Sequence, residues 1–215
     1  MTRNMMVPVG VVILGMAGIL ALYMCTSTMR STSGVPAQVV KVKEAMRELW
    51  AMHVIWTREY IVSQVANASD LSAVTERLLR NQDDIGNAVV PYYGKEAGQA
   101  LAKLLREHIL IGAAVVKAAQ KDDKKALTEA DEQWHKNAQE LAAFLNKANP
   151  DNWPYQMLVD MFYEHLKLTT GEAVAHIKHD AAADIKAFDE IFAQAMKMAD
   201  DLSNGIVQQF PDKFK

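Results

Sequence analysis

The chain contains one cysteine, Cys25, so no disulfide can form within it. Glycine and proline are also scarce, with 10 and 6 among 215 residues, and no glycine-rich phosphate-binding loop is present. The nucleophile and metalloprotease motifs G-x-S-x-G and H-E-x-x-H are missing as well. The sequence therefore gives no sign of nucleotide-dependent, thiol or serine catalysis, and no catalytic activity is evident.

Positive charge is not concentrated in any segment. The chain has 23 Lys and Arg against 26 Asp and Glu, and only Arg3 and Arg30 precede Pro36. Beyond Pro36 the two signs interleave, with no basic run. Because binding to phosphates needs clustered Lys and Arg, we expect no nucleic-acid partner.

One long apolar run stands at the amino terminus. From Met5 to Cys25 no residue is charged, and about 20 apolar residues suffice to cross a bilayer. We expect residues 1–26 to form a single-pass transmembrane anchor. A cleaved signal peptide is an alternative, but its apolar region is usually about 7–15 residues long. A lipoprotein signal ending at Cys25 is a second alternative, disfavoured by the bulky Tyr23 and Met24 before it.

The flanks of this run leave its orientation open, because Arg3 lies on one side and Arg30 on the other. Residues 27–35 are rich in Ser and Thr and lack a hydrophobic period, which predicts a flexible tether. Residues 36–215 form the remaining domain. The expected partners are a membrane and, through glycines in the run, a second copy or another protein.

Apolar residues recur every three or four positions from Pro36 to the end, which is typical of amphipathic helices. The last segment is too long for one helix of a compact domain, so we expect a break between Thr169 and Asp180. Short corners predict an all-α, up-and-down bundle of four to six antiparallel helices. The expected helical segments are 36–65, 71–90, 95–120, 124–147 and 155–209, with a turn at 91–94.

Several apolar stripes are interrupted by residues that bind metals. If these stripes face inward, a bundle core could gather them as di-iron bundles gather Glu and His. His179 and Asp184 also reproduce the H-x₄-D spacing of hemerythrin-type proteins. Fe, Mn or Zn would then be the cofactor, and otherwise none is expected. The candidate ligands are His53, His108, His165, Glu172 and His176.

The same histidines have a structural interpretation, because buried polar side chains in bundles commonly bond one another or a trapped water. None of the candidate histidines follows a glutamate at the Glu-x-x-His spacing of di-iron bundles. Arg58 or Glu59 is expected to pair with Asp83 or Asp84. The segment 81–84 is either a solvated face or an interhelical hydrogen-bond patch. Both interpretations of the histidines stay open.

Aromatic residues suggest a third alternative, a bundle that binds a small molecule or lipid in an internal cavity. Trp50, Trp56, Tyr60 and the Tyr92–Tyr93 corner would surround it. Packing against one another is the simpler role for these side chains.

Several blocks in order resemble a family of small, uncharacterised bacterial helical proteins. They include LWAMHVIWTREYIVS, LLREHILIGAAVVKAA, EHLKLTTGEAVA and MADDLSNGIVQQFPDKF. The resemblance covers about residues 45–214 and implies a helical fold and no reaction. Some members are labelled glycosyltransferase or acetylglutamate kinase, but this chain lacks the glycine-rich α/β scaffold that such enzymes need.

The sequence thus predicts a membrane-anchored helical bundle with a structural or interaction role. The alternative is a transition-metal-binding bundle, hemerythrin-like or di-iron-like, with His and Glu ligands in its core.

Overall fold

The structure is a computed structural model, and it describes residues 34–215. The predicted anchor, residues 1–26, and nearly all of the predicted tether, residues 27–35, lie outside the described residues. Within residues 34–215, no helix combines the length and apolar character that a membrane crossing requires. The anchor therefore stays a prediction from the sequence.

All regular structure in residues 34–215 is helical, which confirms the predicted all-α class. The expected break in the last segment is also confirmed, since one helix ends at Ile177 and the next begins at Ala181. The elements are α1 (Ala37–Ala66), α2 (Leu71–Tyr93), α3 (Lys95–Gln120), α4 (Lys124–Ala148), α5 (Tyr155–Ile177), α6 (Ala181–Gln209) and the short 3₁₀ helix η1 (Pro211–Phe214).

The predicted end of the second helix was wrong. Instead of turning at 91–94, α2 continues through Pro91 and ends at Tyr93. Proline is tolerated here because it lies in the last turn of the helix, where the loss of its backbone N–H disturbs few of the helical hydrogen bonds. Gly94 then reverses the chain with a φ of 85°, a left-handed value that glycine adopts without strain.

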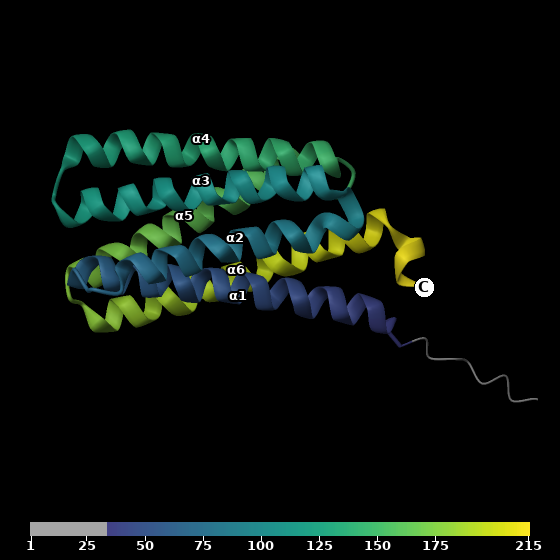
Figure 1. Cartoon of the computed structure of the whole chain (residues 1–215), viewed down its shortest axis with the longest axis horizontal. Coiled ribbons are helices and arrows are strands. Elements are labelled where there is room, and N and C mark those ends of the chain that lie inside the picture. The colour runs from purple at the N-terminus through teal and green to yellow at the C-terminus, as the bar shows by residue number, and fades with distance from the viewer. Residues whose placement is uncertain (1–33) are drawn as a thin grey trace, which may run out of the picture. The chain divides into compact units, whose positions relative to one another are not determined.

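The six helices form a closed ring. Each helix packs against the one before and the one after it, and α1 also packs against α6. Turns alternate between the two ends of the bundle, so neighbours run antiparallel (Figure 1). The odd-numbered helices α1, α3 and α5 contact one another as well, which places them nearest the centre. The start of α1 lies at the same end as η1.

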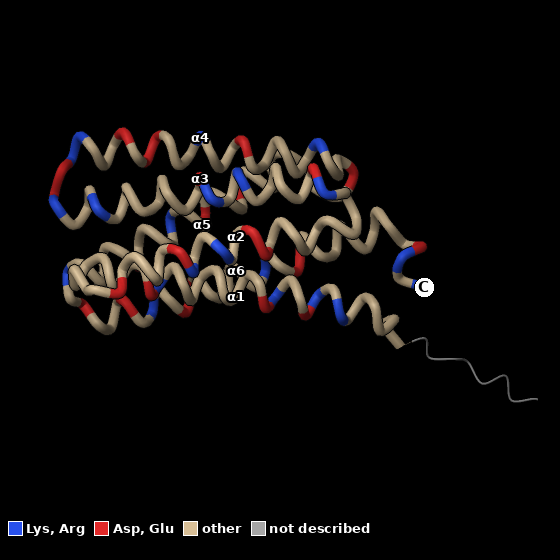
Figure 2. Tube along the Cα trace, in the orientation of Figure 1, with Lys and Arg blue, Asp and Glu red and all other residues tan. Residues whose placement is uncertain are grey.

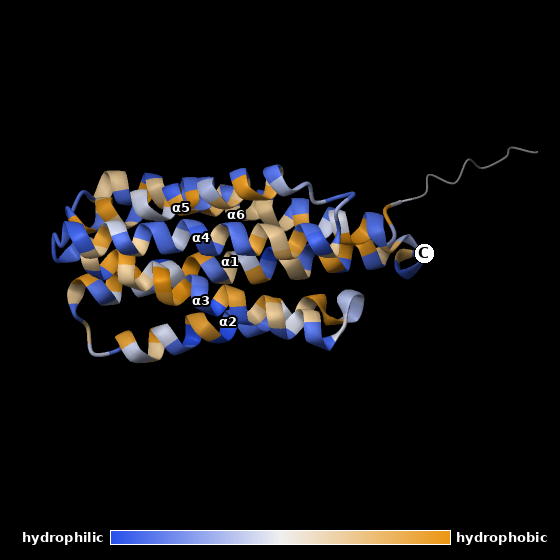
Figure 3. Ribbon diagram, turned by 90° about the horizontal axis from the view of Figure 1, so that it is seen from above, coloured by the Kyte–Doolittle hydropathy of each residue, from blue (hydrophilic) through white to orange (hydrophobic). Residues whose placement is uncertain are grey.

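The outer surface carries charges of both signs, interspersed along all six helices (Figure 2). Several ion pairs join residues one turn apart on the same helix, as Lys103 and Glu107 do. Hydrophobic and hydrophilic residues alternate around every helix in the view from above (Figure 3). This pattern fits amphipathic helices whose apolar stripes face the interior.

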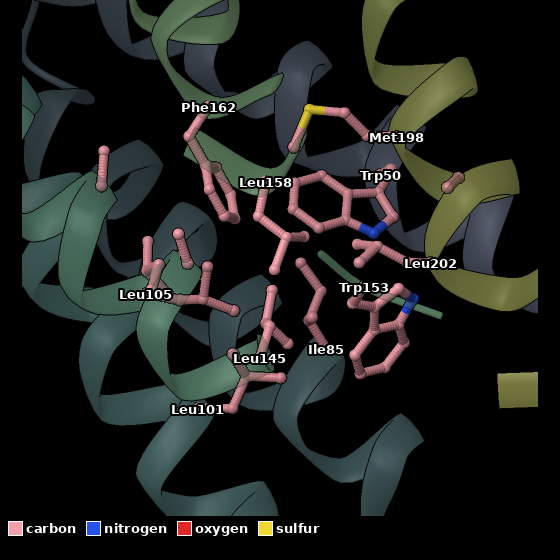
Figure 4. Close-up of a cluster of buried hydrophobic side chains, with 14 of the residues drawn as sticks. Trp50, Ile85, Leu101, Leu105, Leu145, Trp153, Leu158, Phe162, Met198 and Leu202 are labelled. Atoms are coloured by element: carbon pink, nitrogen blue, oxygen red, sulfur yellow. The ribbon is translucent and has the colours of Figure 1, made fainter. Parts of the chain in front are cut away.

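The largest apolar cluster draws side chains from all six helices (Figure 4). Trp50 of α1 points into this cluster, and Met198 and Leu202 are drawn beside it. Trp153, in the loop before α5, packs directly on the backbone of α6 at Gly205. A Cβ atom at Gly205 would lie 2.0 Å from the indole nitrogen, so only glycine fits there without movement.

Candidate functional site

Three of the predicted ligands meet at the centre of the bundle. His53 of α1, His108 of α3 and His165 of α5 are each 2–4% exposed. The ring centroids of His53 and His165 lie 5.4 Å apart, and those of His108 and His165 lie 6.3 Å apart. All three rings line one internal cavity of about 30 Å³.

The helices bring these rings together because each histidine interrupts an otherwise apolar inward stripe. One turn before each histidine stands a large buried side chain: Trp50, Leu105 or Phe162. Residues three and four apart share a helix face, so the histidine must point inward with them. The three odd-numbered helices then bring the rings to one point at the centre.

Each ring is held by a side-chain amide of the next helix. His108 Nδ1 lies 2.9 Å from Asn137 Oδ1, and His165 Nδ1 lies 3.0 Å from Gln194 Oε1. His53 Nδ1 lies 3.3 Å from Gln82 Nε2. These contacts occupy one nitrogen of each ring, which leaves Nε2 for the cavity that the rings line.

The sequence only partly indicated these amides. Asn81 and Gln82 are buried and bonded, so the interhelical patch expected at 81–84 is present at its first two residues. Asp84 is exposed instead. Gln194 was not predicted. A repeated spacing could have indicated it: in each helix pair, the amide that contacts the ring lies 29 residues after the histidine.

The buried rings are uncharged near neutral pH. Burial is the main cause that lowers the pKa of His108 from 6.5 to about 3. Burial also places the pKa of His53 well below 6.5 and lowers that of His165. For His53 and His108, charge on a neighbouring ring lowers the pKa further. Neutral imidazole is the form that binds metals.

The spacing of the rings is close to that of a three-histidine metal site. Ligand nitrogens about 2.1 Å from one ion place ring centroids about 5.4 Å apart. The His53 and His165 rings already have this separation, and the His108 and His165 rings are somewhat farther apart. As placed, no group of three or more His, Cys, Asp or Glu in residues 34–215 meets metal-holding geometry. The His108 ring would have to move inward to complete such a site.

The other two predicted ligands, Glu172 and His176, belong to a separate cluster around Arg58. The Arg58 guanidinium donates to Glu172 Oε1 at 2.7 Å and to Asp184 Oδ1 at 2.8 Å. His176 Nδ1 lies 3.0 Å from Asp184 Oδ2. The five predicted ligands therefore divide into a histidine trio and a charged cluster that joins α1, α5 and α6.

The predicted pairing of Arg58 was wrong. Arg58 does not pair with Asp83 or Asp84, because it lies on the side of α1 that faces α5 and α6; Asp83 pairs with Arg106 instead. The H-x₄-D spacing of His179 and Asp184 does not become a contact: His179 is exposed at a φ of 57°, and His176 is bonded to Asp184 instead.

The charged cluster has perturbed protonation. Burial raises the pKa of Glu172 from 4.5 to about 7, although Arg58 acts in the opposite direction. Burial also raises the pKa of Asp184, but its bonds to Arg58 and His176 outweigh burial and lower it overall. Glu172 thus changes charge near neutral pH, whereas Asp184 stays ionised.

The aromatic side chains offered for a small-molecule site do not gather around one cavity. Tyr60 lines the histidine cavity, whereas the Tyr92–Tyr93 corner packs elsewhere. Tyr92 stacks on Phe214, and Tyr93 lies against Trp153. Besides the histidine cavity, the apolar core holds a cavity of about 20 Å³ beside Trp50. Cavities that bind drug-sized molecules are about 300–1,000 Å³, so these two take nothing larger than a few atoms.

Comparisons with protein-family models, curated proteins and solved structures found no match to this chain. The resemblance to small bacterial helical proteins stays a prediction, and function is argued from the site alone.

Proposed function

We propose that this protein is a membrane-tethered helical bundle that binds one transition-metal ion through His53, His108 and His165. The observation that carries the proposal is the convergence of three neutral, buried imidazoles on one cavity. Each ring is held at Nδ1 by an amide of a neighbouring helix. Metal-ligating histidines usually have their second nitrogen bonded in this way.

The ligand set favours zinc among the metals considered. Three imidazole nitrogens suit Zn²⁺, and also Cu or Fe, better than the oxygen-preferring Mn²⁺. Three histidines with a fourth position open to water are a recurring zinc arrangement. A cavity of about 30 Å³ has room for an ion and a small exogenous ligand such as water.

Glu172 and His176 are left out of this ligand set. Glu172 lies two helical turns beyond His165 and is bonded to Arg58. His176 is bonded to Asp184. The site we propose is therefore a mononuclear three-histidine site and not a di-iron centre, which would need bridging carboxylates.

Metal titration of the full-length, chelator-treated protein in detergent tests the proposal. We expect one equivalent of Zn²⁺ by calorimetry and a tetrahedral Co²⁺ absorption spectrum. His108→Gln and His53→Gln should each weaken binding by more than the about 10- to 100-fold that loss of an outer partner costs. The exposed His179→Asn is the matched control and should bind like wild type.

Circular dichroism verifies that each variant is folded before its affinity is compared. Uptake below about a tenth of an equivalent by folded wild type would overturn the proposal. The structural or interaction role would then be favoured, because the same histidine–amide bonds join the helices of each pair without a metal.

The membrane location rests on the uncharged run Met5–Cys25. We expect alkaline carbonate washing to leave the full-length chain in the membrane pellet. A chain that begins at Gly34 should be released by the same wash. Release of the full-length chain would show that residues 1–26 do not anchor it.

A further inference from the structure

The six helices pair into three hairpins that share one pattern of polar and buried residues. The pairs α1–α2, α3–α4 and α5–α6 each carry a central histidine on the first helix and an amide on the second. His53, His108 and His165 are separated by 55 and 57 residues, the differences between their numbers. The histidine cavity is therefore built by three equivalent units.

The burial pattern repeats in register with the histidines. On each first helix, the residues seven and three before the histidine and one after it are buried. These are Met46, Trp50 and Val54; Leu101, Leu105 and Ile109; and Leu158, Phe162 and Leu166.

The second helices repeat in the same way around an amide. On each second helix, the residues one, four and eight positions after the amide are buried. The three amides are Asn81, Asn137 and Gln194. These are Gln82, Ile85 and Val89; Ala138, Leu141 and Leu145; and Ala195, Met198 and Leu202.

The equivalent amides also share a backbone partner, the carbonyl one turn before each histidine. Asn81 Nδ2 donates to Leu49 O at 3.1 Å. Asn137 Nδ2 donates to Leu104 O at 3.1 Å, and Gln194 Nε2 donates to Met161 O at 3.0 Å. A carbonyl only accepts, so these bonds fix which end of each amide is nitrogen.

The amide orientation decides the tautomer of two rings. In the second and third hairpins the amide oxygen faces His108 Nδ1 and His165 Nδ1. An oxygen accepts, so each Nδ1 must carry the proton. Their Nε2 atoms then keep a lone pair on the cavity side.

The first hairpin differs, because Gln82 and not Asn81 reaches the ring. Gln82 Nε2 donates to Leu78 O at 2.9 Å and to Asn81 Oδ1 at 3.1 Å, and it lies 3.3 Å from His53 Nδ1. These two bonds use both hydrogens of the amide, and an amide nitrogen accepts none. A proton on His53 Nδ1 would therefore have no acceptor there, so His53 carries its proton on Nε2. Gln82 Oε1 is buried and has no hydrogen-bond partner among residues 34–215.

We propose that Gln82, Asn137 and Gln194 are positioning residues that set unequal tautomers in the histidine trio. His108 and His165 present lone pairs to the cavity, and His53 presents an N–H. The consequence for metal uptake rests on the proposed function: His108 and His165 can bind a metal in their present tautomers, and His53 cannot. For His53 to ligate, Nε2 loses a proton and Nδ1 gains one. The Gln82 amide then turns and gives up its bonds to Leu78 O and Asn81 Oδ1, so that Oε1 accepts from Nδ1.

The tautomers can be measured without metal. Long-range ¹H–¹⁵N correlation spectra of metal-free, histidine-labelled protein should show Nδ1–H for His108 and His165 and Nε2–H for His53. Asn137→Leu should convert His108 to a mixture or to Nε2–H, and Asn137→Asp, which keeps an acceptor, should retain Nδ1–H. The exposed Asn87→Leu on α2 is the control and should change none of the rings.

Two outcomes overturn the positioning role: Nε2–H at His108 in wild type, or an unchanged His108 tautomer in a folded Asn137→Leu protein. Zn²⁺ titration then separates the two proposals. Asn137→Leu should lower affinity about 10- to 100-fold, and Gln82→Glu, whose carboxylate favours Nδ1–H at His53, should raise it. The expected tautomers without any Zn²⁺ binding would support positioning and refute the metal site.

Discussion

Burial of three neutral histidines should make the metal-free fold sensitive to acid, and His108 allows the size to be worked out. Its pKa falls from 6.5 to about 3 on folding. A group with a depressed pKa contributes stability that is present above pH 6.5 and lost as the pH falls toward 3. A shift of about 3.5 units corresponds to about 5 kcal/mol, lost at about 1.4 kcal/mol per pH unit.

The perturbation is His108→Gln, which cannot titrate but can still donate to Asn137 Oδ1. Urea unfolding of both proteins, followed by circular dichroism with a chelator present, gives the free energy of unfolding between about pH 7 and pH 4. We expect the wild-type slope to be steeper by one proton, about 1.4 kcal/mol per pH unit. His179→Asn, an exposed histidine, should keep the wild-type slope.

Equal slopes for wild type and His108→Gln would refute this reasoning, because His108 would then bind its proton equally well folded and unfolded. Glu172 has a raised pKa and contributes in the opposite direction, but it is present in both proteins and cancels in the difference.

Three further predictions concern packing and the charged cluster. Glu172→Gln should gain about 3 kcal/mol relative to wild type between about pH 5 and pH 8, since the stability from a pKa raised to about 7 is lost as pH rises; equal pH profiles in urea unfolding would contradict this. Gly205→Ala should cost about 1–3 kcal/mol by displacing Trp153, whereas Gly171→Ala, with open space around it, should gain about 0.5–1 kcal/mol in thermal melts. Arg58→Leu should cost about 3–5 kcal/mol in urea unfolding, because it leaves the buried Glu172 carboxylate without a side-chain partner and Asp184 with His176 alone; a cost below about 1 kcal/mol would show that the cluster is solvated.

The helices were predictable because residues at and beside each corner mark the helix boundaries. Asn, Asp, Gly and Pro interrupt the apolar period at most corners, and the chain turns at these points. Pro91 shows the limit of this rule. A proline in the last turn gives up little backbone bonding, so the helix passes through it before ending.

The inward direction of the histidines was also predictable, since each shares a face with large apolar residues. The sequence did not predict which polar residues lie together. Periodicity gives the face of each helix but not its rotation or axial position against a neighbour, so His165 and Glu172 seemed to belong to one site. The structure assigns His165 to the central trio and Glu172 to Arg58.

The threefold repeat of the hairpins escaped detection for a similar reason. The equivalent positions conserve burial and hydrogen-bonding type, not residue identity: Trp50, Leu105 and Phe162 occupy one of them. The histidine is the one side chain of the central site that all three first helices share in type. An amide about 29 residues later is a weak signal until the helix pairing is known.

The closed ring has a consequence for synthesis on the ribosome. The apolar face that α1 turns toward α6 has no cover until the last helix of the described chain has emerged. Gln194, which holds His165, also arrives late. The first two hairpins therefore keep this apolar face exposed, and the central site can form only after α6 has emerged.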